Sequence, residues 1–564
     1  MSKSLAWFVW AITAALLGCF FVWPIFTTVQ RAFFDADGHF TFAYIAEVFR
    51  NEIYVEGLRN SFLLALASTA ATLAIALPLA WLSDRFIFPG KKTLNALLLV
   101  PMILPPFVGA IGVRQMLGQY GALNTALTHL GILAPGSTID WLGGGQFWGI
   151  VILNALHLYP ILFLNLTAAL ANLDPAMEEA AANLGCTGFR RFRRITWPLI
   201  MPGVFAGGTI VFIFAFTELG TPLIFDYARV TSVQIFYGIK EISGNPFPFA
   251  LVVVMLAATL LLYTASKLLF GRSEHAMSGK AGTASTARTL TGARGWLCAL
   301  AFASVTLVAL LPHIGVVLES VAGDWYRTVL PGSFTTQHYR DALGHYLTVP
   351  SIANSLKYAS LSVVFDIFLG IAIAYVIVRT RLPGRHLLDA LSMLPLAVPG
   401  LVLAFGYLSM TQPGRAFEML NPSADPTLLL IIAYAVRRLP YVVRSAVAGL
   451  QQTSETLEEA AQNLGCPPLR TLRRITFPLI AANVLAGALL AFSFAMLEVS
   501  DSLILAQKQQ NFPITKAIYE LFQLIGDGKF LAAALGVWAM LFLALTIAIA
   551  SSVLGKKMGA LFRV

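Results

Sequence analysis

Several acidic residues, Asp366 among them, lie within strongly apolar stretches of the chain, where ionisable side chains are costly and commonly serve a function. Glu218 in "FAFTELGTPLIF" and Glu498 in "FAMLEVSDSLIL" occupy equivalent positions 280 residues apart, and Asp501 follows Glu498 by three residues. Two carboxylates on equivalent helices could line a shared pathway and would suit a cationic or metal substrate. They could equally bond to neighbouring helices or face a wet vestibule, so both interpretations stay open here.

Two arginines, Arg437 and Arg438, lie just before Pro440 in another apolar stretch. The first half has His157 and Leu158 at the equivalent positions. Guanidinium groups bind anions and carboxylates well. The pair could therefore bind an anionic substrate, or it could form ion pairs with the acidic residues of the neighbouring stretch. All five ionisable residues are candidates for a translocation path, with structural pairing as the alternative.

The sequence contains no motif for phosphate binding or hydrolytic catalysis. The nearest string to the phosphate loop G-x-x-x-x-G-K-[ST] is "SGKA" (278–281), which lacks the upstream Gly and the Ser or Thr after Lys. H-E-x-x-H and G-x-S-x-G are absent, and Cys19, Cys186, Cys298 and Cys466 show neither a CxxC pair nor zinc-site spacing. We therefore expect a chain that is not an enzyme, binds no ATP and holds no metal cofactor.

The composition predicts that these ionisable residues are positioned by membrane-spanning helices. Of 564 residues, 57% are hydrophobic and only 12% are charged, with a mean hydropathy of +0.75, whereas soluble domains have about 25% charged residues. Residues 5–29 carry no charge, and about 20 such residues suffice to cross a bilayer. This run is longer than the core of a cleaved signal, so we expect a retained first helix.

Comparable apolar segments lie near 61–82, 94–113, 146–171, 199–225, 248–266, 295–318, 355–378, 387–411, 427–450, 479–506 and 530–554. The predicted fold class is an all-α polytopic membrane protein with about twelve transmembrane helices. Lys and Arg are denser in the loops that share a side with the N-terminus, which predicts cytoplasmic N- and C-termini. The net charge of +10 then reflects orientation, and no nucleic-acid partner is needed to explain it.

The chain is a tandem repeat. Pro89 matches Pro383 at an offset of 294 residues, and Pro198 matches Pro478 at an offset of 280. Each half has six predicted spans with both ends on one side, so the halves are parallel six-helix repeats. The predicted division, written as ranges, is a first six-helix domain at 1–270, a flexible cytoplasmic linker rich in Gly, Ser, Thr and Ala at 271–294, and a second six-helix domain at 295–564.

The most closely repeated stretch is "EEAAANLGC" (178–186), which returns as "EEAAQNLGC" (458–466). In the first copy, Asp174 is suited to cap the start of a helix and Gly185 to end it. The helix is about ten residues or roughly 15 Å long, which is too short to span a membrane. A single copy could be an ordinary amphipathic helix at the membrane surface, but near-identity in both halves argues for a shared role.

The second copy is predicted to begin at Ser454 and to stop at Gly465. Helical spacing places apolar residues on one face of each helix, namely Met177, Ala180, Ala181 and Leu184, and Leu457, Ala460, Ala461 and Leu464. The opposite flank is predicted to carry Glu178, Glu179 and Asn183, and Glu458, Glu459 and Asn463. The central alanines of the apolar face would let another protein approach closely.

Both copies fit one longer pattern: E-A-A, three residues, G, nine residues, then I-x-hydrophobic-P. The matching residues are Glu179, Ala180, Ala181, Gly185, Ile195 and Pro198 in the first half, and Glu459, Ala460, Ala461, Gly465, Ile475 and Pro478 in the second. This pattern resembles the EAA loop of bacterial type I ABC importer permeases, and it places such loops at 174–198 and 454–478. The fusion of two halves resembles the ferric-iron, thiamine and 2-aminoethylphosphonate permeases of that class.

The resemblance implies a set of partners. In that family the short helix of each loop docks into a groove of an ATP-binding-cassette ATPase subunit, so the E-A-A and G residues of both loops would couple to ATP hydrolysis. Two loops imply two ATPase subunits, which carry the ATP and Mg, and a periplasmic or lipoprotein substrate-binding protein on the outer face. The chain would then be a multi-pass protein of a bacterial inner membrane, in contact with the lipid bilayer.

The fused architecture and the intramembrane carboxylates favour ferric iron as substrate, while thiamine, 2-aminoethylphosphonate or a polyamine stay open. A proton-coupled secondary transporter with two six-helix halves is the alternative class. "LSDRFIFPGKK" (82–92) is similar to the major-facilitator loop G-x-x-x-D-R-x-G-R-K, but it lacks the first Gly and the correct spacing. Neither that class nor a membrane receptor or scaffold predicts symmetrical short helices in both halves.

Overall fold

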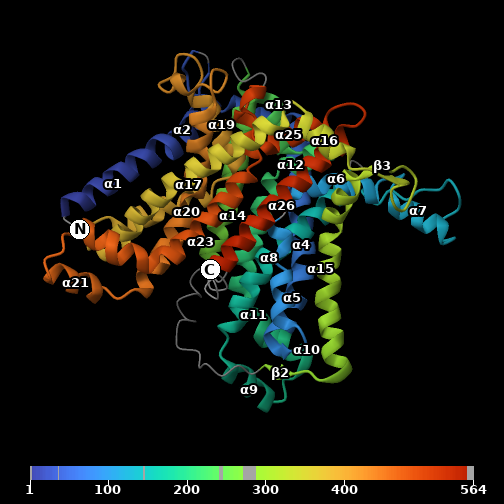
Figure 1. Ribbon diagram of the computed structural model, residues 1–564, viewed down its shortest axis with the longest axis horizontal. Coiled ribbons are helices and arrows are strands. Elements are labelled where there is room, and N and C mark those ends of the chain that lie inside the picture. The colour runs from blue at the N-terminus through green and yellow to red at the C-terminus, as the bar shows by residue number, and fades with distance from the viewer. Residues whose placement is uncertain are drawn as a thin grey trace. The chain divides into compact units, whose positions relative to one another are not determined.

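The computed structural model describes residues 3–35, 37–103, 105–143, 146–239, 245–270 and 287–554, which are almost entirely helical (Figure 1). The strands are very short. β1 (Phe86–Ile87) pairs in parallel with β2 (Arg288–Thr289), and β3 (Ala322–Asp324) pairs antiparallel with β4 (Ser333–Phe334). Residues 271–286 of the predicted linker lie outside the described residues. The prediction of an all-α polytopic membrane fold is confirmed.

Nine helical runs among the described residues are long and apolar enough to cross a membrane. They are Leu5–Phe33, Glu52–Arg85, Phe147–Ala171, Gly188–Ile224, Phe247–Ser266, Gly292–Ser320, Thr348–Arg379, Leu472–Met496 and Gly528–Thr546. Two sharply bent pairs, Lys91–Met102 with Pro106–His129 and Arg385–Leu396 with Gly400–Met410, raise the number to eleven if each pair is one span. The prediction of about twelve spans therefore exceeds this number by one.

The difference is the span predicted at 427–450. A helix does form there, because α20 runs from Thr427 to Gln452 over 26 residues. It carries Arg437, Arg438 and Arg444, and these charges make it too polar to count as an apolar span. The length of the segment indicated a helix correctly, but its charge sets it apart from the other spans.

The chain folds into two compact units, and neither unit coincides with one sequence half. The first unit comprises Met1–Val55, Val233–Leu256 and Gln337–Phe562, and the second comprises Glu56–Ser232 and Ala257–Thr336. The N-terminal helices are thus grouped with the second half of the sequence, and residues 292–336 with the first half. The domain boundaries predicted at 1–270 and 295–564 describe the repeat in the sequence, and as such they stay predictions.

The first unit is built around α17, α20 and α23, which pack on one another. Its elements are α1 (Lys3–Leu17), η1 (Gly18–Val22), α2 (Trp23–Phe33), α3 (Ala43–Arg50), α16 (Gln337–Gly344), α17 (Thr348–Arg379), α18 (Arg385–Met393), η7 (Leu394–Leu396), α19 (Gly400–Met410), η8 (Glu418–Leu420), α20, α21 (Thr456–Asn463), α22 (Pro468–Thr471), η9 (Leu472–Thr476), α23 (Phe477–Met496), α24 (Ser500–Leu505), η10 (Gln509–Asn511), α25 (Ile514–Phe522) and α26 (Gly528–Leu554). Val363, Val442, Ala488 and Ala491 form an apolar cluster between the three central helices.

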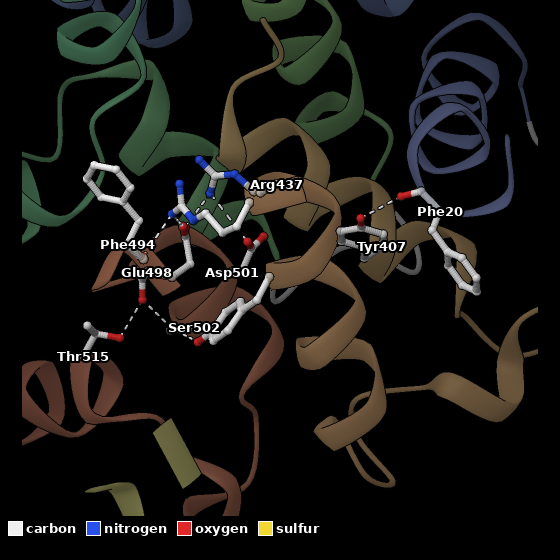
Figure 2. A network of polar contacts seen from close by, with 10 residues as sticks. Phe20, Tyr407, Arg437, Phe494, Glu498, Asp501, Ser502 and Thr515 are labelled. Atoms are coloured by element: carbon white, nitrogen blue, oxygen red, sulfur yellow. Dashed lines mark hydrogen bonds and ion pairs between the residues drawn. The ribbon is translucent and has the colours of Figure 1, made fainter. Parts of the chain in front are cut away.

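The N-terminal helices of this unit pack on α19 through α2. Gly406 permits the close approach, because a Cβ atom at this position would lie 2.7 Å from the carbonyl oxygen of Pro24. The hydroxyl of Tyr407 donates a hydrogen bond of 2.6 Å to the carbonyl of Phe20, within the π-helical turn η1 (Figure 2). Such a turn leaves carbonyls available to side chains of a neighbouring helix.

The second unit is built around two helix pairs, α15 on α6 and α11 on α8. Its elements are β1, α5 (Lys91–Leu97), η2 (Val100–Ile103), α6 (Pro106–Leu117), α7 (Ala122–His129), α8 (Phe147–Ala171), α9 (Pro175–Asn183), α10 (Gly188–Arg191), η4 (Phe192–Thr196), α11 (Trp197–Thr217), α12 (Gly220–Ile224), β2, α15 (Gly292–Ser320), β3 and β4, while α4 (Glu52–Arg85), α13 (Thr231–Gly238) and α14 (Phe247–Phe270) have residues in both units. Gly112 lies directly against the backbone of Pro312, so α6 and α15 can approach only with a glycine there.

Prolines account for the two bent spans. In the first unit, Arg385–Leu396 and Gly400–Met410 meet at 98°, and Pro399 between them is extended with φ −57° and ψ 139°. Pro105 is extended in the same way before α6 of the second unit. Proline has no backbone N–H to continue a helix, so the chain starts a new helix after each of them.

Candidate functional site

The first repeated nonapeptide forms a short helix, as predicted. Its helix α9 begins at Pro175 and ends at Asn183, and the carboxylate of Asp174 accepts a 2.9 Å hydrogen bond from the amide of Ala176. Gly185 follows the helix with φ +79°, a conformation that glycine adopts at low cost. The local sequence therefore fixes both ends of α9.

The second nonapeptide forms α21, which begins at Thr456, two residues later than the predicted start at Ser454. The Ser454 hydroxyl still accepts a 3.3 Å hydrogen bond from the amide of Thr456. Gly465 ends the segment with φ +83°. Figure 1 shows α9 and α21 as short helices in the connections between much longer ones.

The exposed face of each short helix is apolar at its ends. Met177 and Leu184 are 50% and 88% exposed in α9, and Leu457 and Leu464 are 48% and 89% exposed in α21. The predicted coupling residues Glu179, Ala180 and Gly185, and Glu459, Ala460 and Gly465, are also exposed. Large exposed apolar side chains beside small ones are typical of a surface that another protein covers.

The predicted faces of these helices need two corrections. Glu178 and Glu458 were placed on the polar flank opposite the apolar face, but both are buried, unlike Glu179 and Glu459 on the same flank. Ala181 and Ala461 were placed on the docking face, but they are buried with these glutamates. The reason is that each glutamate binds an arginine from another helix of its own unit, which turns this side of the short helix inward.

A π-helical turn follows each short helix at equivalent positions. Both η4 (Phe192–Thr196) and η9 (Leu472–Thr476) lead directly into a membrane span. Two arginines stand in each turn. A π-turn inserts an extra residue into a helix and frequently marks a functional site. The two loops therefore share their helix, their glycine and their entry into the next span.

The second group of predicted residues forms a polar cluster of buried carboxylates and partly buried arginines in the first unit (Figure 2). Arg437 of α20 donates a 2.5 Å hydrogen bond to one carboxylate oxygen of Glu498 and lies 3.5 Å from Asp501. Arg438 binds the other oxygen of Glu498 and donates 3.2 Å to the carbonyl of Phe494. The structure thus brings all four residues of the second half together and pairs the arginines with the acids.

The backbone beside Glu498 is also held. Its carbonyl oxygen accepts hydrogen bonds from the hydroxyls of Ser502 at 2.5 Å and Thr515 at 2.7 Å (Figure 2). Tyr434 of α20 lies 2.7 Å from the Ser502 hydroxyl. The cluster therefore joins α20 to the break between α23 and α24, where Glu498 and Asp501 are both buried.

Glu218, the first-half counterpart of Glu498, has different surroundings. Its carboxylate accepts hydrogen bonds from the amide of Thr221 at 3.1 Å and from the Thr221 hydroxyl at 3.2 Å. Its carbonyl accepts a 2.6 Å hydrogen bond from Ser232. A small crevice lined by Ser61, Pro222 and Ser232 adjoins it. Glu218 belongs to the second unit, whereas the residues of the arginine cluster belong to the first.

The sequence did not indicate the roles of two arginines that these contacts reveal, and it left Asp366, which lies in the predicted span 355–378, without a role. Arg85 and Arg379, the partners of the buried glutamates, each end a long helix and are equivalent at the repeat offset of 294. That equivalence is the signal that could have found them. Asp366 is fully buried in α17, and within the described part of the chain its carboxylate oxygens have no hydrogen-bond partner.

The chain matches one protein family twice. The family described as "Binding-protein-dependent transport system inner membrane component" matches residues 53–279 and 366–556, one segment in each half. Together these segments cover well over half of the chain, and each contains one of the short helices α9 and α21.

Individual relatives extend over most of the sequence. The putative ferric transport system permease protein FbpB 1 of Haemophilus influenzae is 29% identical over 514 residues, which cover 86% of this chain and 75% of the relative. The ferric transport system permease protein FbpB of Actinobacillus pleuropneumoniae is 28% identical over 516 residues, covering 86% and 69%. The probable ABC transporter permease protein y4fN of Sinorhizobium fredii is 25% identical over 525 residues, covering 91% and 89%.

These matches, the apolar helices and the duplicated loop agree on one class of protein and decide against the secondary transporter considered as an alternative. The chain belongs to the family of binding-protein-dependent transport system inner membrane components, as a fused, multi-pass permease of an ABC importer.

Proposed function

We propose that this permease carries ferric iron across the membrane. The observation that carries the proposal is that two ferric transport permeases each align with 86% of this chain, through both halves. Thiamine, 2-aminoethylphosphonate and polyamines are the competing substrates, and they are outcomes of the test described below.

The proposed path runs beside Glu218, Glu498, Asp501, Arg437 and Arg438. Carboxylate oxygens are suitable ligands for a hard cation such as ferric iron. In the state described here both oxygens of Glu498 are bound by arginines, so the cluster would have to exchange an arginine for the substrate during transport. Glu218 accepts hydrogen bonds from Thr221 and so offers a carboxylate in a different setting.

The proposed motor consists of two ATP-binding-cassette ATPase subunits, one for each short helix. The exposed apolar residues Met177 and Leu184 of α9, and Leu457 and Leu464 of α21, support docking of a partner at both places. The proposed coupling residues are the exposed Glu179, Ala180 and Gly185, and Glu459, Ala460 and Gly465, while the buried Ala181 and Ala461 of the same strings would support the docking face from within. ATP and Mg would bind to those subunits and not to this chain.

The proposed orientation places both termini and both short helices in the cytoplasm. The arginines of η4 and η9 lie between the short helices and the next membrane span, and basic residues favour the cytoplasmic side of a bacterial inner membrane. A periplasmic or lipoprotein substrate-binding protein would then dock on the opposite face. Closure of the ATPase subunits would move the two short helices and switch the path between inward and outward access.

The test is uptake by proteoliposomes that contain the permease with its co-expressed ATPase subunits and binding protein. We expect the proteoliposomes to accumulate radioactive ferric iron only when ATP is present on the side of the membrane that holds the ATPase subunits. Accumulation should stop when the phosphate-loop lysine of the ATPase is replaced. Labelled thiamine, 2-aminoethylphosphonate and putrescine are supplied in parallel. ATP-dependent uptake of one of these, with none of iron, would contradict the substrate. Uptake by a proton gradient without ATPase subunits would contradict the mechanism.

A further inference from the structure

A buried ion pair fastens α9 to the end of a long helix. Arg85 is the last residue of α4, and its guanidinium binds the carboxylate of Glu178 in α9. The Thr196 hydroxyl donates a 2.6 Å hydrogen bond to the same carboxylate oxygen. The Glu178 side chain is only 6% exposed. One glutamate therefore connects α9 both to α4 and to the π-turn that enters α11.

An equivalent ion pair fastens α21. Arg379 is the last residue of α17, and its Nε donates a 3.2 Å hydrogen bond to Glu458, whose side chain is 4% exposed. Tyr375, one helical turn earlier in α17, donates its hydroxyl at 2.8 Å to the other oxygen of Glu458. Arg379 also donates to the carbonyls of Leu450 at 3.0 Å and Thr453 at 2.7 Å, at the end of α20.

The charged partners are the same in the two halves, whereas the hydroxyl donor differs. Arg85 matches Arg379 at the offset of 294, and Glu178 matches Glu458 at the offset of 280. Thr476 is the counterpart of Thr196, yet among the described residues its buried hydroxyl has no hydrogen-bond partner. Tyr375 supplies the missing hydroxyl, and the first half has Trp81 in its place.

The two sites therefore share an arginine, a carboxylate and a hydroxyl donor, although the hydroxyl comes from different positions. Packing alone would not require a carboxylate, an arginine and a hydroxyl at both places, because a buried ion pair contributes little net stability compared with apolar side chains of similar size. Its geometry is directional, however, and a partly buried charge-assisted bond holds two helices in one relative position. A mechanical connection needs that property.

We infer that Arg85 and Arg379 are positioning residues that transmit movement of α9 and α21 to the membrane helices α4 and α17. The inference rests on the proposed coupling of the two short helices to ATPase subunits. Glu178 and Glu458 face inward and bind these arginines, whereas the exposed Glu179 and Glu459 face the partner. The first glutamate of each E-E-A-A string thus serves the permease itself, and the second serves the docking surface.

The experiment compares ATP hydrolysis with iron uptake in the complete complex of permease, ATPase subunits and binding protein. The double variant Arg85→Gln with Arg379→Gln is expected to keep its ATPase subunits through purification and to hydrolyse ATP. Its uptake per ATP should fall about tenfold, which is the change expected when a charge-assisted hydrogen bond to a buried carboxylate is lost. Loss of a purely structural contact would lower uptake and hydrolysis together and leave their ratio unchanged.

Milder variants serve if the double variant does not reach the membrane. Thr196→Val with Tyr375→Phe keeps both ion pairs and removes both hydroxyl donors, so uptake per ATP should fall about threefold. Thr476→Val is the matched control, because it removes an equivalent hydroxyl that holds no hydrogen bond among the described residues, and the ratio should not change. The charge exchange Arg379→Glu with Glu458→Arg should recover part of the ratio lost in Arg379→Glu alone.

The outcomes distinguish the inference from the proposed function. If the unaltered permease retains no ATPase subunits, the proposed coupling is wrong and the inference falls with it. If ATPase subunits are retained, but the arginine variants and the hydroxyl variants transport iron with the unaltered uptake per ATP, the two arginines do not transmit movement. The coupling through the exposed faces of α9 and α21 would stand in that case.

Discussion

The anchor of α21 is more extensive than the anchor of α9, although both bind an equivalent glutamate; we call the arginine and the bonds that fasten each short helix its anchor. Arg379 binds Glu458 and two carbonyls at the end of α20, and it is 6% exposed. Arg85 binds Glu178 and lies 3.4 Å from the carboxylate of its neighbour Asp84, and it is 18% exposed. One arginine thus connects three helices, whereas the other is shared between two acids.

The difference teaches that equivalent ion pairs in the two repeats can hold their short helices with unequal strength. In the second half, α17, α20 and α21 meet at a single guanidinium. In the first half, the connection depends on the ion pair and on Thr196 of the following π-turn. We therefore expect the two anchors to respond unequally to the same substitution, and the predictions below follow from that expectation.

Arg379→Ala should have the largest effect. It removes the partner of Glu458 and the donor of two buried carbonyls, and breaking a buried pair on one side costs about 3–5 kcal/mol. Hydrogen exchange of the α21 amides should accelerate by at least a hundredfold, and iron uptake per ATP should fall at least tenfold. If the exchange of α21 stays as slow as in the unaltered chain, Arg379 does not anchor this helix.

Arg85→Ala should have a smaller effect on α9 for the same reason in reverse. Each glutamate keeps one hydroxyl donor, Thr196 for Glu178 and Tyr375 for Glu458. Arg85 is 18% exposed, whereas Arg379 is 6% exposed and also binds two carbonyls, so less buried bonding is lost with Arg85. We expect a loss of about 2 kcal/mol at this helix. Hydrogen exchange of the α9 amides, measured in parallel with α21 of the Arg379 variant, checks the ranking. Equal acceleration at both helices would remove the asymmetry between the anchors.

The two halves should also differ at their intramembrane carboxylates. Glu498→Gln leaves the partly buried Arg437 and Arg438 without their common carboxylate, so we expect uptake to fall at least tenfold, equivalent to about 1.4 kcal/mol or more. Glu218→Gln keeps an oxygen that accepts hydrogen bonds from Thr221, and uptake should fall less than threefold. Both variants are compared at equal amounts of permease in the membrane. A larger loss for Glu218→Gln would make Glu218 the more important carboxylate for transport.

The smallest effect that we expect is the weakening of the Arg85–Glu178 anchor by acid. Burial raises the pKa of Glu178, but the hydrogen bonds from Arg85 and Thr196 and the charges of Arg85 and Arg191 outweigh it, so the pKa lies below its ordinary value of 4.5. The anchor is therefore complete above pH 4.5 and is lost as the pH falls through the lowered pKa. Exchange of α9 in Glu178→Gln should differ from the unaltered chain at neutral pH, and the difference should shrink below pH 4.5. A difference that grows with acid would contradict this assignment.

Local signals predicted the short helices well. Asp174 sets the start of α9 and Gly185 sets its end. Both signals were readable because a capping side chain and a left-handed glycine act on residues next to them in the chain. The ion pairs were not predicted, since Arg85 and Glu178 are separated by 93 residues and meet only through packing. Amphipathic spacing assigned Glu178 to the flank opposite the apolar face, because spacing within one helix does not reveal an arginine on another helix.

Tertiary packing also explains the other differences. The grouping of residues 1–55 with the second half follows from α2 on α19, which no local pattern reveals. The ion pairs of Arg437 and Arg438 were one of two interpretations of the sequence, and their partner Glu498 lies 60 residues away along the chain. The residue types allowed either anion binding or ion pairing for Arg437 and Arg438, and only the fold shows that they are paired with the carboxylates.

The most direct test of the account is the retention of ATPase subunits by a permease with reversed charge on both exposed helix faces. In Glu179→Lys with Glu459→Lys, only exposed side chains change, so membrane insertion and the amount of permease should match the unaltered chain. We predict that the purified double variant retains no ATPase subunit and takes up no iron. Retention of both subunits with unaltered uptake would contradict the claim that α9 and α21 couple this permease to its motor.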